Sequence, residues 1–131
     1  MPIRRWNPPG IAAPASRFSH AALATGATSW LHLSGQVGVA PGGRVAEGLA
    51  AQLDQCFANV AAGLAGAGMT RADLVKLTVY VTDASPEAVA TYRARRDAFV
   101  GEGPAPAATY LVVAGLASAA LLAEVDAVAA A

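Results

Sequence analysis

Apolar side chains recur at helical spacing in the middle of the chain. Between residues 47 and about 67 they stand three or four residues apart, at Leu49, Leu53, Cys56, Val60, Leu64 and Ala67. This period predicts an amphipathic helix with one apolar face. Gly66 and Gly68 predict its end, because glycine adopts the left-handed conformation that a helix C-terminus often needs. Residues 70–73 then predict a short turn capped by Thr70.

A strict alternation of apolar and polar side chains follows in residues 74–82 and predicts a strand with one buried face. Ser85, Pro86 and Glu87 then predict the start of a second helix, which reaches about Val100. The serine can cap this helix, proline suits its first position, and the helix dipole favours the glutamate.

Two further apolar segments close the chain. Residues 109–114 are nearly all apolar, which indicates a strand buried on both faces. Residues 121–129 predict a last strand, in which Glu124 and Asp126 point to the same side.

The N-terminal part begins with a proline-rich arm, residues 1–15. Apolar stretches at residues 18–24 and 30–37 follow, joined by a turn-rich connector, and favour a β-hairpin. Strands and helices then follow in the order β-β-α-β-α-β-β within one α+β domain, residues 1–131. Two long helices cover one face of a sheet but not both. The uncovered face would be an apolar surface of the kind that marks a subunit interface, so we expect an oligomer.

Charge and length exclude several classes of partner. Nine basic and nine acidic side chains cancel, so no basic field attracts nucleic acid or an anionic membrane. The apolar runs are broken before they reach a membrane-spanning length. The N-terminus has no apolar segment after its two arginines, so we expect no secretory signal and a cytoplasmic protein.

The sequence holds no motif for a metal or a cofactor. A Gly-rich phosphate loop, a nucleophile elbow and an HExxH zinc motif are all missing from it. Cys56 is the one cysteine and is most simply a small buried side chain. His20 and His32 have no third ligand candidate nearby in sequence. We therefore expect neither a metal nor a cofactor.

Six segments carry a recognisable order and spacing. They are Phe-Ser-His-Ala at residues 18–21, Leu-Ser-Gly-Gln-Val-Gly at 33–38, Gln52 and Asn59 before residues 64–68, the strand at 75–83, Pro106 with the strand after it, and residues 124–129. Together they resemble the RidA (YjgF, endoribonuclease L-PSP) family over roughly residues 16–130.

The resemblance implies a chorismate-mutase-like fold, with a mixed sheet and two helices on one face. It further implies a homotrimer in which three sheets form a central barrel, with a ligand cleft at each subunit boundary. Active members of the family are imine or enamine deaminases that release 2-oxo acids and ammonia. An arginine in a Pro-Ala-Arg segment binds the substrate carboxylate in those members.

This chain departs from the family at that arginine. Pro106, Ala107 and Ala108 place an alanine there, which offers neither charge nor donor. A guanidinium suits a carboxylate because its planar fork stays charged, so we do not expect a standard 2-iminobutyrate deaminase. Arg93, Arg95 and Arg96 lie on the second helix and could substitute, although a solvated helix face is the alternative. Arg96 is the best candidate because it shares a stripe with Val89 and Val100.

The resemblance also implies further site residues. Glu124 matches the family's acidic residue that handles the attacking water, and its alternative is a structural role; for Asp126 the structural role is favoured. Phe18 keeps the aromatic wall of the cleft without a hydroxyl. The remaining candidate ligand contacts are Ser34, Gly35, Gln36 and Thr109, with Tyr110 as a second hydroxyl donor. Ser34, Gly35 and Gln36 have an alternative reading as a β-bulge needed only for folding.

The sequence leaves three functions open. The first is a trimer that binds a small organic metabolite between subunits and hydrolyses or deaminates it. The second is a trimer that binds a metabolite or partner without catalysis. The third, endoribonuclease or translation inhibition, is disfavoured by the neutral charge.

Overall fold

A computed structural model describes residues 2–131. Two α-helices, α1 (Leu49–Gly66) and α2 (Pro86–Val100), confirm the predicted helical segments. The Ser85 side chain caps α2 by accepting from the Ala88 amide at 3.1 Å, with Pro86 at the first position. Gly68, at φ +69°, follows the end of α1. Neither helix has the length and hydrophobicity needed to cross a lipid bilayer within the described residues.

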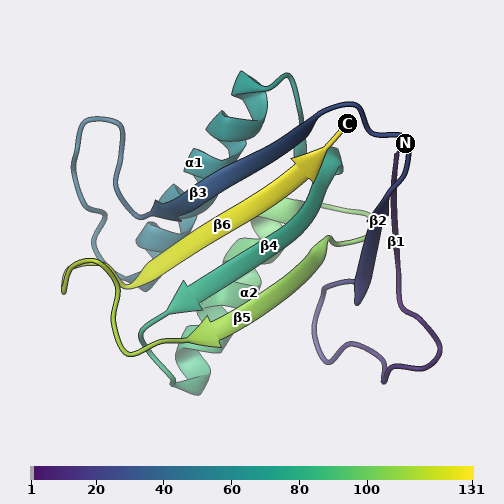
Figure 1. Ribbon diagram of the computed structural model, residues 1–131. Helices are drawn as coiled ribbons and strands as arrows, with labels where there is room; N and C mark the ends of the chain where they lie inside the picture. Colours follow the sequence, from purple (N-terminus) through teal and green to yellow (C-terminus); the bar gives the residue numbers. More distant parts are fainter. Residues whose placement is uncertain (1) are drawn as a thin grey trace.

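Four strands form one mixed sheet in the order β3-β6-β4-β5 (Figure 1). Their bounds are β3 Trp30–Val37, β4 Leu74–Val81, β5 Ala107–Val112 and β6 Ala123–Ala130. β6 is antiparallel to both β3 and β4, whereas β4 and β5 are parallel. A short 3-10 helix, Arg71–Asp73, leads into β4 and has the predicted cap at Thr70.

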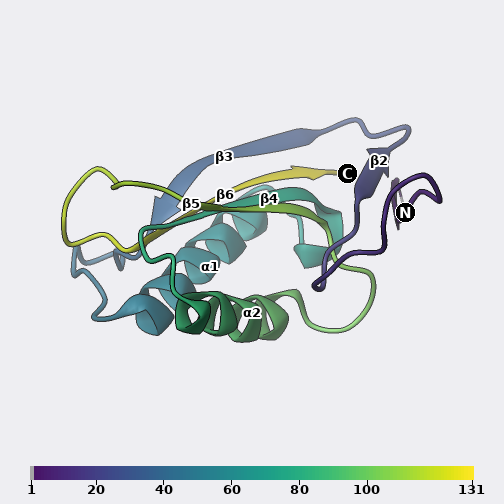
Figure 2. The ribbon, with the colours of Figure 1, turned by 90° about the horizontal axis from the view of Figure 1, so that it is seen from below.

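Both helices cover the same face of this sheet, as Figure 2 shows. The core lies between the helices and the sheet. It consists of the apolar faces of α1, β4 and β6 together with Tyr92 of α2. Alternate residues of β6 are buried, which confirms that Glu124 and Asp126 point together to the other, helix-free face. The α+β class with two helices on one face is therefore confirmed.

The predicted β-hairpin between residues 18–24 and 30–37 is wrong. β2 (Ala21–Ala24) pairs instead with β1 (Ile3–Trp6), a strand that lies inside the predicted N-terminal arm. The turn before β3 explains this, because the Thr28 and Ser29 amides both donate to the Ala131 carbonyl. The connector thus directs β3 to the end of β6 rather than back along β2.

Two predictions of burial are also wrong. β5 is an edge strand, and Leu111 and Val112 are 43% and 48% exposed, so it is not buried on both faces. The helix-free face is not uniformly apolar, because its side chains alternate with those of the core. It combines polar and apolar side chains: Trp30, His32, Lys76, Thr78, Tyr80, Thr109, Glu124, Asp126 and Val128.

Candidate functional site

A pocket of about 270 Å³ lies between α2 and the edge strand β5, and we call it the α2–β5 pocket. Five of the residues that the sequence singled out line it: Phe18, Arg93, Arg96, Ala108 and Tyr110. Val89, Tyr92 and Arg96 come from one face of α2, at the spacing that brings helical side chains together. Ala108 and Tyr110 face them because residues two apart on a strand share a side.

Arg96 is buried in this pocket, with only 4% of the residue exposed. Its Nη1 donates to the Ser16 hydroxyl at 3.0 Å, and its Nε donates to an Asp97 carboxylate oxygen at 3.1 Å. The guanidinium also lies 5.3 Å from the centre of the Tyr92 ring. The alternative of a solvated helix face is therefore wrong for Arg96, whereas Arg93 and Arg95 are exposed.

Two tyrosines form the polar part of the wall beside Arg96. The rings of Tyr92 and Tyr110 lie 4.7 Å apart. Burial raises the pKa of both hydroxyls, and for Tyr92 the nearby Arg96 charge opposes that rise. The Tyr110 hydroxyl is buried and has no hydrogen-bond partner within residues 2–131. The pocket thus holds the Arg96 guanidinium and the unpaired Tyr110 hydroxyl, and Ala108 lines the same pocket.

Glu124 lies on the other side of the sheet, next to Gly35 of β3. A Cβ on Gly35 would come within 2.6 Å of the Glu124 carboxyl carbon, closer than real side chains approach. The β3–β6 ladder shifts register between Leu33 and Gln36, so Ser34 and Gly35 form the irregular part of β3. This bulge and the missing side chain leave the space that the Glu124 carboxylate occupies.

The remaining candidates are distributed over both faces. Gln36 pairs with Val125 of the core, so it lies on the helix side, and its amide donates to the Ser34 carbonyl at 3.0 Å. Thr109 lies on the helix-free face, where its hydroxyl accepts from Lys76 Nζ at 2.9 Å. Tyr80 donates to an Asp126 carboxylate oxygen at 2.9 Å on the same face, and this bond raises the pKa of Tyr80.

One chain therefore holds two separate groups of candidate residues. Phe18, Arg96 and Ala108 meet in the α2–β5 pocket, whereas Ser34, Gly35 and Glu124 meet near the helix-free face. The sequence grouped them as one cleft and did not single out Ser16 or Tyr92. Tyr92 stands four residues before Arg96, and that helical spacing was the available signal.

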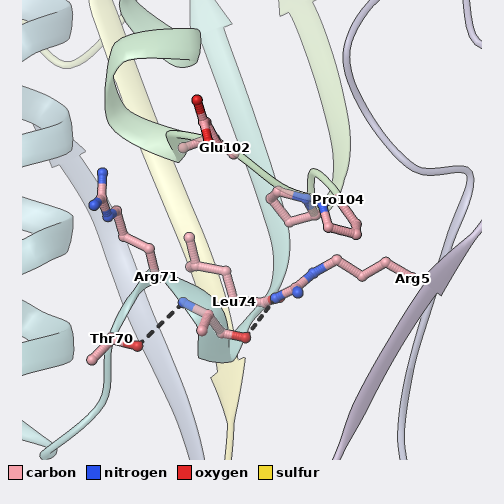
Figure 3. A pocket seen from close by; sticks show the side chains of 9 residues that line it. Arg5, Thr70, Arg71, Leu74, Glu102 and Pro104 are labelled. Carbon is pink, nitrogen blue, oxygen red and sulfur yellow. Dashed lines mark hydrogen bonds between the residues drawn. The ribbon is translucent and has the colours of Figure 1, made fainter. Parts of the chain in front are cut away.

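A second cavity of about 420 Å³ separates the ends of β1, β4 and α2. Figure 3 shows Arg5 from β1 pointing to the start of β4, with Arg71 on the far side of Leu74 and Glu102 above it. Arg5 donates to the carbonyl oxygens of Ala72 and Leu74 at 2.7 and 2.6 Å. Burial lowers the pKa of Arg5, and the Asp73 charge opposes that shift. These contacts tie the N-terminal strand to the main sheet.

The mixed sheet with both helices on one face places the protein in the α+β class. Residues 10–131 match the family model described as "Endoribonuclease L-PSP". The chain belongs to this family, which is the RidA/YjgF family.

Individual relatives agree with this assignment. A RutC family protein of Aquifex aeolicus is 38% identical over 82 residues, a match that spans 62% of this chain and 63% of that protein. The fold is similar to that of a Rid family protein of unknown function, YyfB from Yersinia pestis, with a TM-score of 0.92, 34% identity and full coverage of both chains. The yjgF gene product of E. coli gives a TM-score of 0.70 at 33% identity, over 93% of this chain and 91% of that one.

Proposed function

We propose that the protein is a homotrimer that binds a small organic molecule in clefts between subunits and hydrolyses an imine or enamine there. The observation that carries this proposal is the fit of the Glu124 carboxylate against Gly35. Glu124 is only partly buried, so a molecule at the helix-free face can reach its carboxylate. A carboxylate at hydrogen-bond distance from a bound water is a suitable general base.

The reaction needs one proton carrier and one water. Glu124 takes a proton from the water while the water oxygen bonds to the imine carbon, and it passes that proton to the imine nitrogen to give the carbinolamine. It then takes the hydroxyl proton of the carbinolamine as the carbonyl forms and delivers it to the nitrogen, so the carbon–nitrogen bond breaks and ammonia leaves. The carboxylate is thereby regenerated, and neither metal nor cofactor is consumed.

A trimer supplies what one chain lacks. The α2–β5 pocket opens on the helix side, whereas Glu124 lies on the opposite face, so one ligand cannot meet both within one subunit. A neighbouring subunit packed on the helix-free face would bring its own pocket towards this carboxylate. Light scattering should give three times the 13.1 kDa chain mass; a stable monomer at micromolar concentration would contradict the assembly.

The test of catalysis is Glu124→Gln, assayed with imines generated in place from several amino acids. Loss of general acid–base catalysis should lower kcat by about 100-fold or more. Asp126→Asn is the matched control, because that carboxylate accepts from Tyr80 and should leave kcat within a few fold. Equal turnover by wild type and Glu124→Gln for every imine would reject this role.

A second function, metabolite binding without catalysis, is favoured by one observation. Ala108 stands where active relatives carry the carboxylate-binding arginine, so the usual clamp is missing. Saturable ligand binding without turnover by the wild-type protein would select this alternative.

A further inference from the structure

We propose that Arg96 binds the anionic group of the ligand in the α2–β5 pocket, with the Tyr110 hydroxyl as second donor, and that the ligand is a compact monocarboxylate with an apolar body. This inference rests on the proposed function only in placing the ligand in that pocket. It assigns to α2 the task that the family gives to the strand position of Ala108.

The first support is the burial of a charge with little compensation. An arginine on a helix surface normally carries its guanidinium into water, yet Arg96 is 4% exposed. Its one carboxylate partner, Asp97, has a half-exposed side chain and also lies 3.8 Å from Arg17. Its other partner, Ser16, is neutral. Within residues 2–131 the guanidinium donates through Nε and Nη1, and Tyr92 is its remaining polar neighbour.

The second support is independent of Arg96. The Tyr110 hydroxyl is buried without a partner within residues 2–131, although buried hydroxyls are nearly always hydrogen-bonded. Tyr110 lines the same pocket as Arg96. Its ring packs against Tyr92, and the Tyr92 ring in turn lies beside the Arg96 guanidinium. A carboxylate accepts from both a guanidinium and a hydroxyl, so one anionic group would satisfy both donors.

The third support is the space beside Ala108. A methyl group at this position leaves room in the pocket that a longer side chain would fill. A second guanidinium here would also face Arg96 at close range, and like charges repel strongly at low dielectric. An alanine on β5 is therefore compatible with a cation on α2.

The rest of the wall defines the body of the ligand. Phe18, Val89, Tyr92 and Ala108 present apolar and aromatic surface, and the cavity measures about 270 Å³. This volume lies at the small end of ligand sites. A branched aliphatic or single-ring carboxylate fits this description. Arg93 also lines the pocket, but it is exposed, so a dianion lacks a second buried cation.

The experiment measures binding of two matched pairs by NMR titration: isovalerate with isovaleramide, and phenylacetate with phenylacetamide. The wild-type protein should bind each carboxylate at least about 10-fold tighter than its amide. Arg96→Met keeps the length of the side chain without the charge and should weaken carboxylate binding by about 30-fold or more, while amide binding changes little.

Three further variants control this result. Arg96→Lys should retain part of the preference for carboxylates, because it keeps the charge but not the fork. Tyr110→Phe should weaken carboxylate binding several-fold without loss of stability, since it removes an unpaired hydroxyl. Arg95→Met alters an exposed arginine that pairs with Asp54 at 3.2 Å, and it should change the affinity for neither the carboxylates nor the amides.

Two outcomes overturn the inference. One is equal affinity for acid and amide in the wild type, or no binding of either acid at millimolar concentration. The other is unchanged carboxylate binding in folded Arg96→Met; if that variant does not fold, unchanged binding in both Arg96→Lys and Tyr110→Phe overturns it. The experiment measures binding alone. Selectivity for carboxylates without imine turnover would therefore reject the proposed hydrolase activity and leave the role of Arg96 in carboxylate binding intact.

Discussion

Gly35 lies so close to Glu124 that a Cβ added to the glycine would overlap the carboxyl group. The carboxylate fills the volume that a side chain at residue 35 would take, and a register shift in β3 brings the backbone to that point. The position of Glu124 is therefore determined as much by a missing side chain as by its own strand. A bulge needed only for folding and a bulge that positions the catalytic carboxylate would have the same geometry. Substitution of Gly35 distinguishes the two.

Gly35→Ala should displace the Glu124 carboxylate. The new methyl group overlaps the end of a flexible side chain that can move aside, so we expect a loss of less than about 1 kcal/mol in the free energy of unfolding together with reduced turnover of imines. Urea denaturation and the imine assay measure the two effects. Gly10→Ala is the control, because nothing lies within 4 Å of its added Cβ. Full activity of Gly35→Ala would show that the bulge serves folding alone.

The candidate residues differ in how far their roles could be predicted from the sequence. Glu124 and Asp126 were placed on one face because strand periodicity is local, whereas the opposite placement of Glu124 and Ala108 depends on the whole sheet. Arg96 shares a helix stripe with Val89 and Val100, but a stripe does not tell whether a long side chain reaches water. The tertiary fold decides this, because Ala15, Ser16 and Phe18 line the pocket beside Arg96 and the Ser16 hydroxyl accepts from it.

At the scale of elements, Gln52 joins α1 to the loop before β6. Its side chain is 2% exposed and satisfies three backbone groups. The amide nitrogen donates to the Ala46 and Ala120 carbonyls at 3.1 and 2.9 Å, and the amide oxygen accepts from the Leu122 amide at 2.7 Å. One side chain thereby holds two loops, far apart in sequence, against the start of the helix.

Gln52→Leu should destabilise the protein by about 2–4 kcal/mol, since it leaves buried backbone donors and acceptors unsatisfied. Chemical denaturation gives the change, and hydrogen exchange of the Leu122 amide should become faster. Gln55→Leu lies on the same helix and loses only a bond to Asn59, so it should cost less than about 1 kcal/mol. Equal losses for the two variants would contradict a bridging role for Gln52.

The same scale explains which elements the sequence predicted well. Helix ends and the Thr70 turn were correct because capping depends on a few neighbouring residues. The hairpin was wrong because the partner of a strand is chosen by contacts far along the chain. The Ala131 carbonyl is about one hundred residues from the turn that it directs. The prediction that β5 is buried on both faces failed for the same reason. Whether a strand lies at the edge depends on the pairing of the whole sheet and not on the strand's own residues.

At the scale of the whole molecule, the fold separates two kinds of ionisable group. Glu124, Asp126 and Lys76 lie on the helix-free face, whereas Cys56 lies in the core below Glu124. Burial raises the pKa of Cys56 from 9.0 to about 12, and the Glu124 charge adds to that rise. The pKa values of Tyr80, Tyr92 and Tyr110 are also raised from 10.0.

These shifts predict that stability falls at alkaline pH. Above about pH 9 the unfolded chain loses the Cys56 proton while the folded chain keeps it. The folded state then binds more protons than the unfolded state, so the free energy of unfolding decreases as pH rises, by up to about 1.4 kcal/mol per pH unit for one group. The tyrosines increase the slope above about pH 10. Urea denaturation between about pH 7 and pH 11 measures it.

Cys56→Ala separates the thiol from the tyrosines. This variant is less stable at neutral pH because it loses a buried side chain, but its stability should stay level between about pH 9 and pH 10, where the wild type already declines. Above that range the wild type should keep the steeper slope up to about pH 12, because the tyrosines act in both proteins and the thiol acts in the wild type alone. If both proteins lose stability equally from pH 9, the thiol ionises in the folded state, and the core beneath Glu124 is open to water.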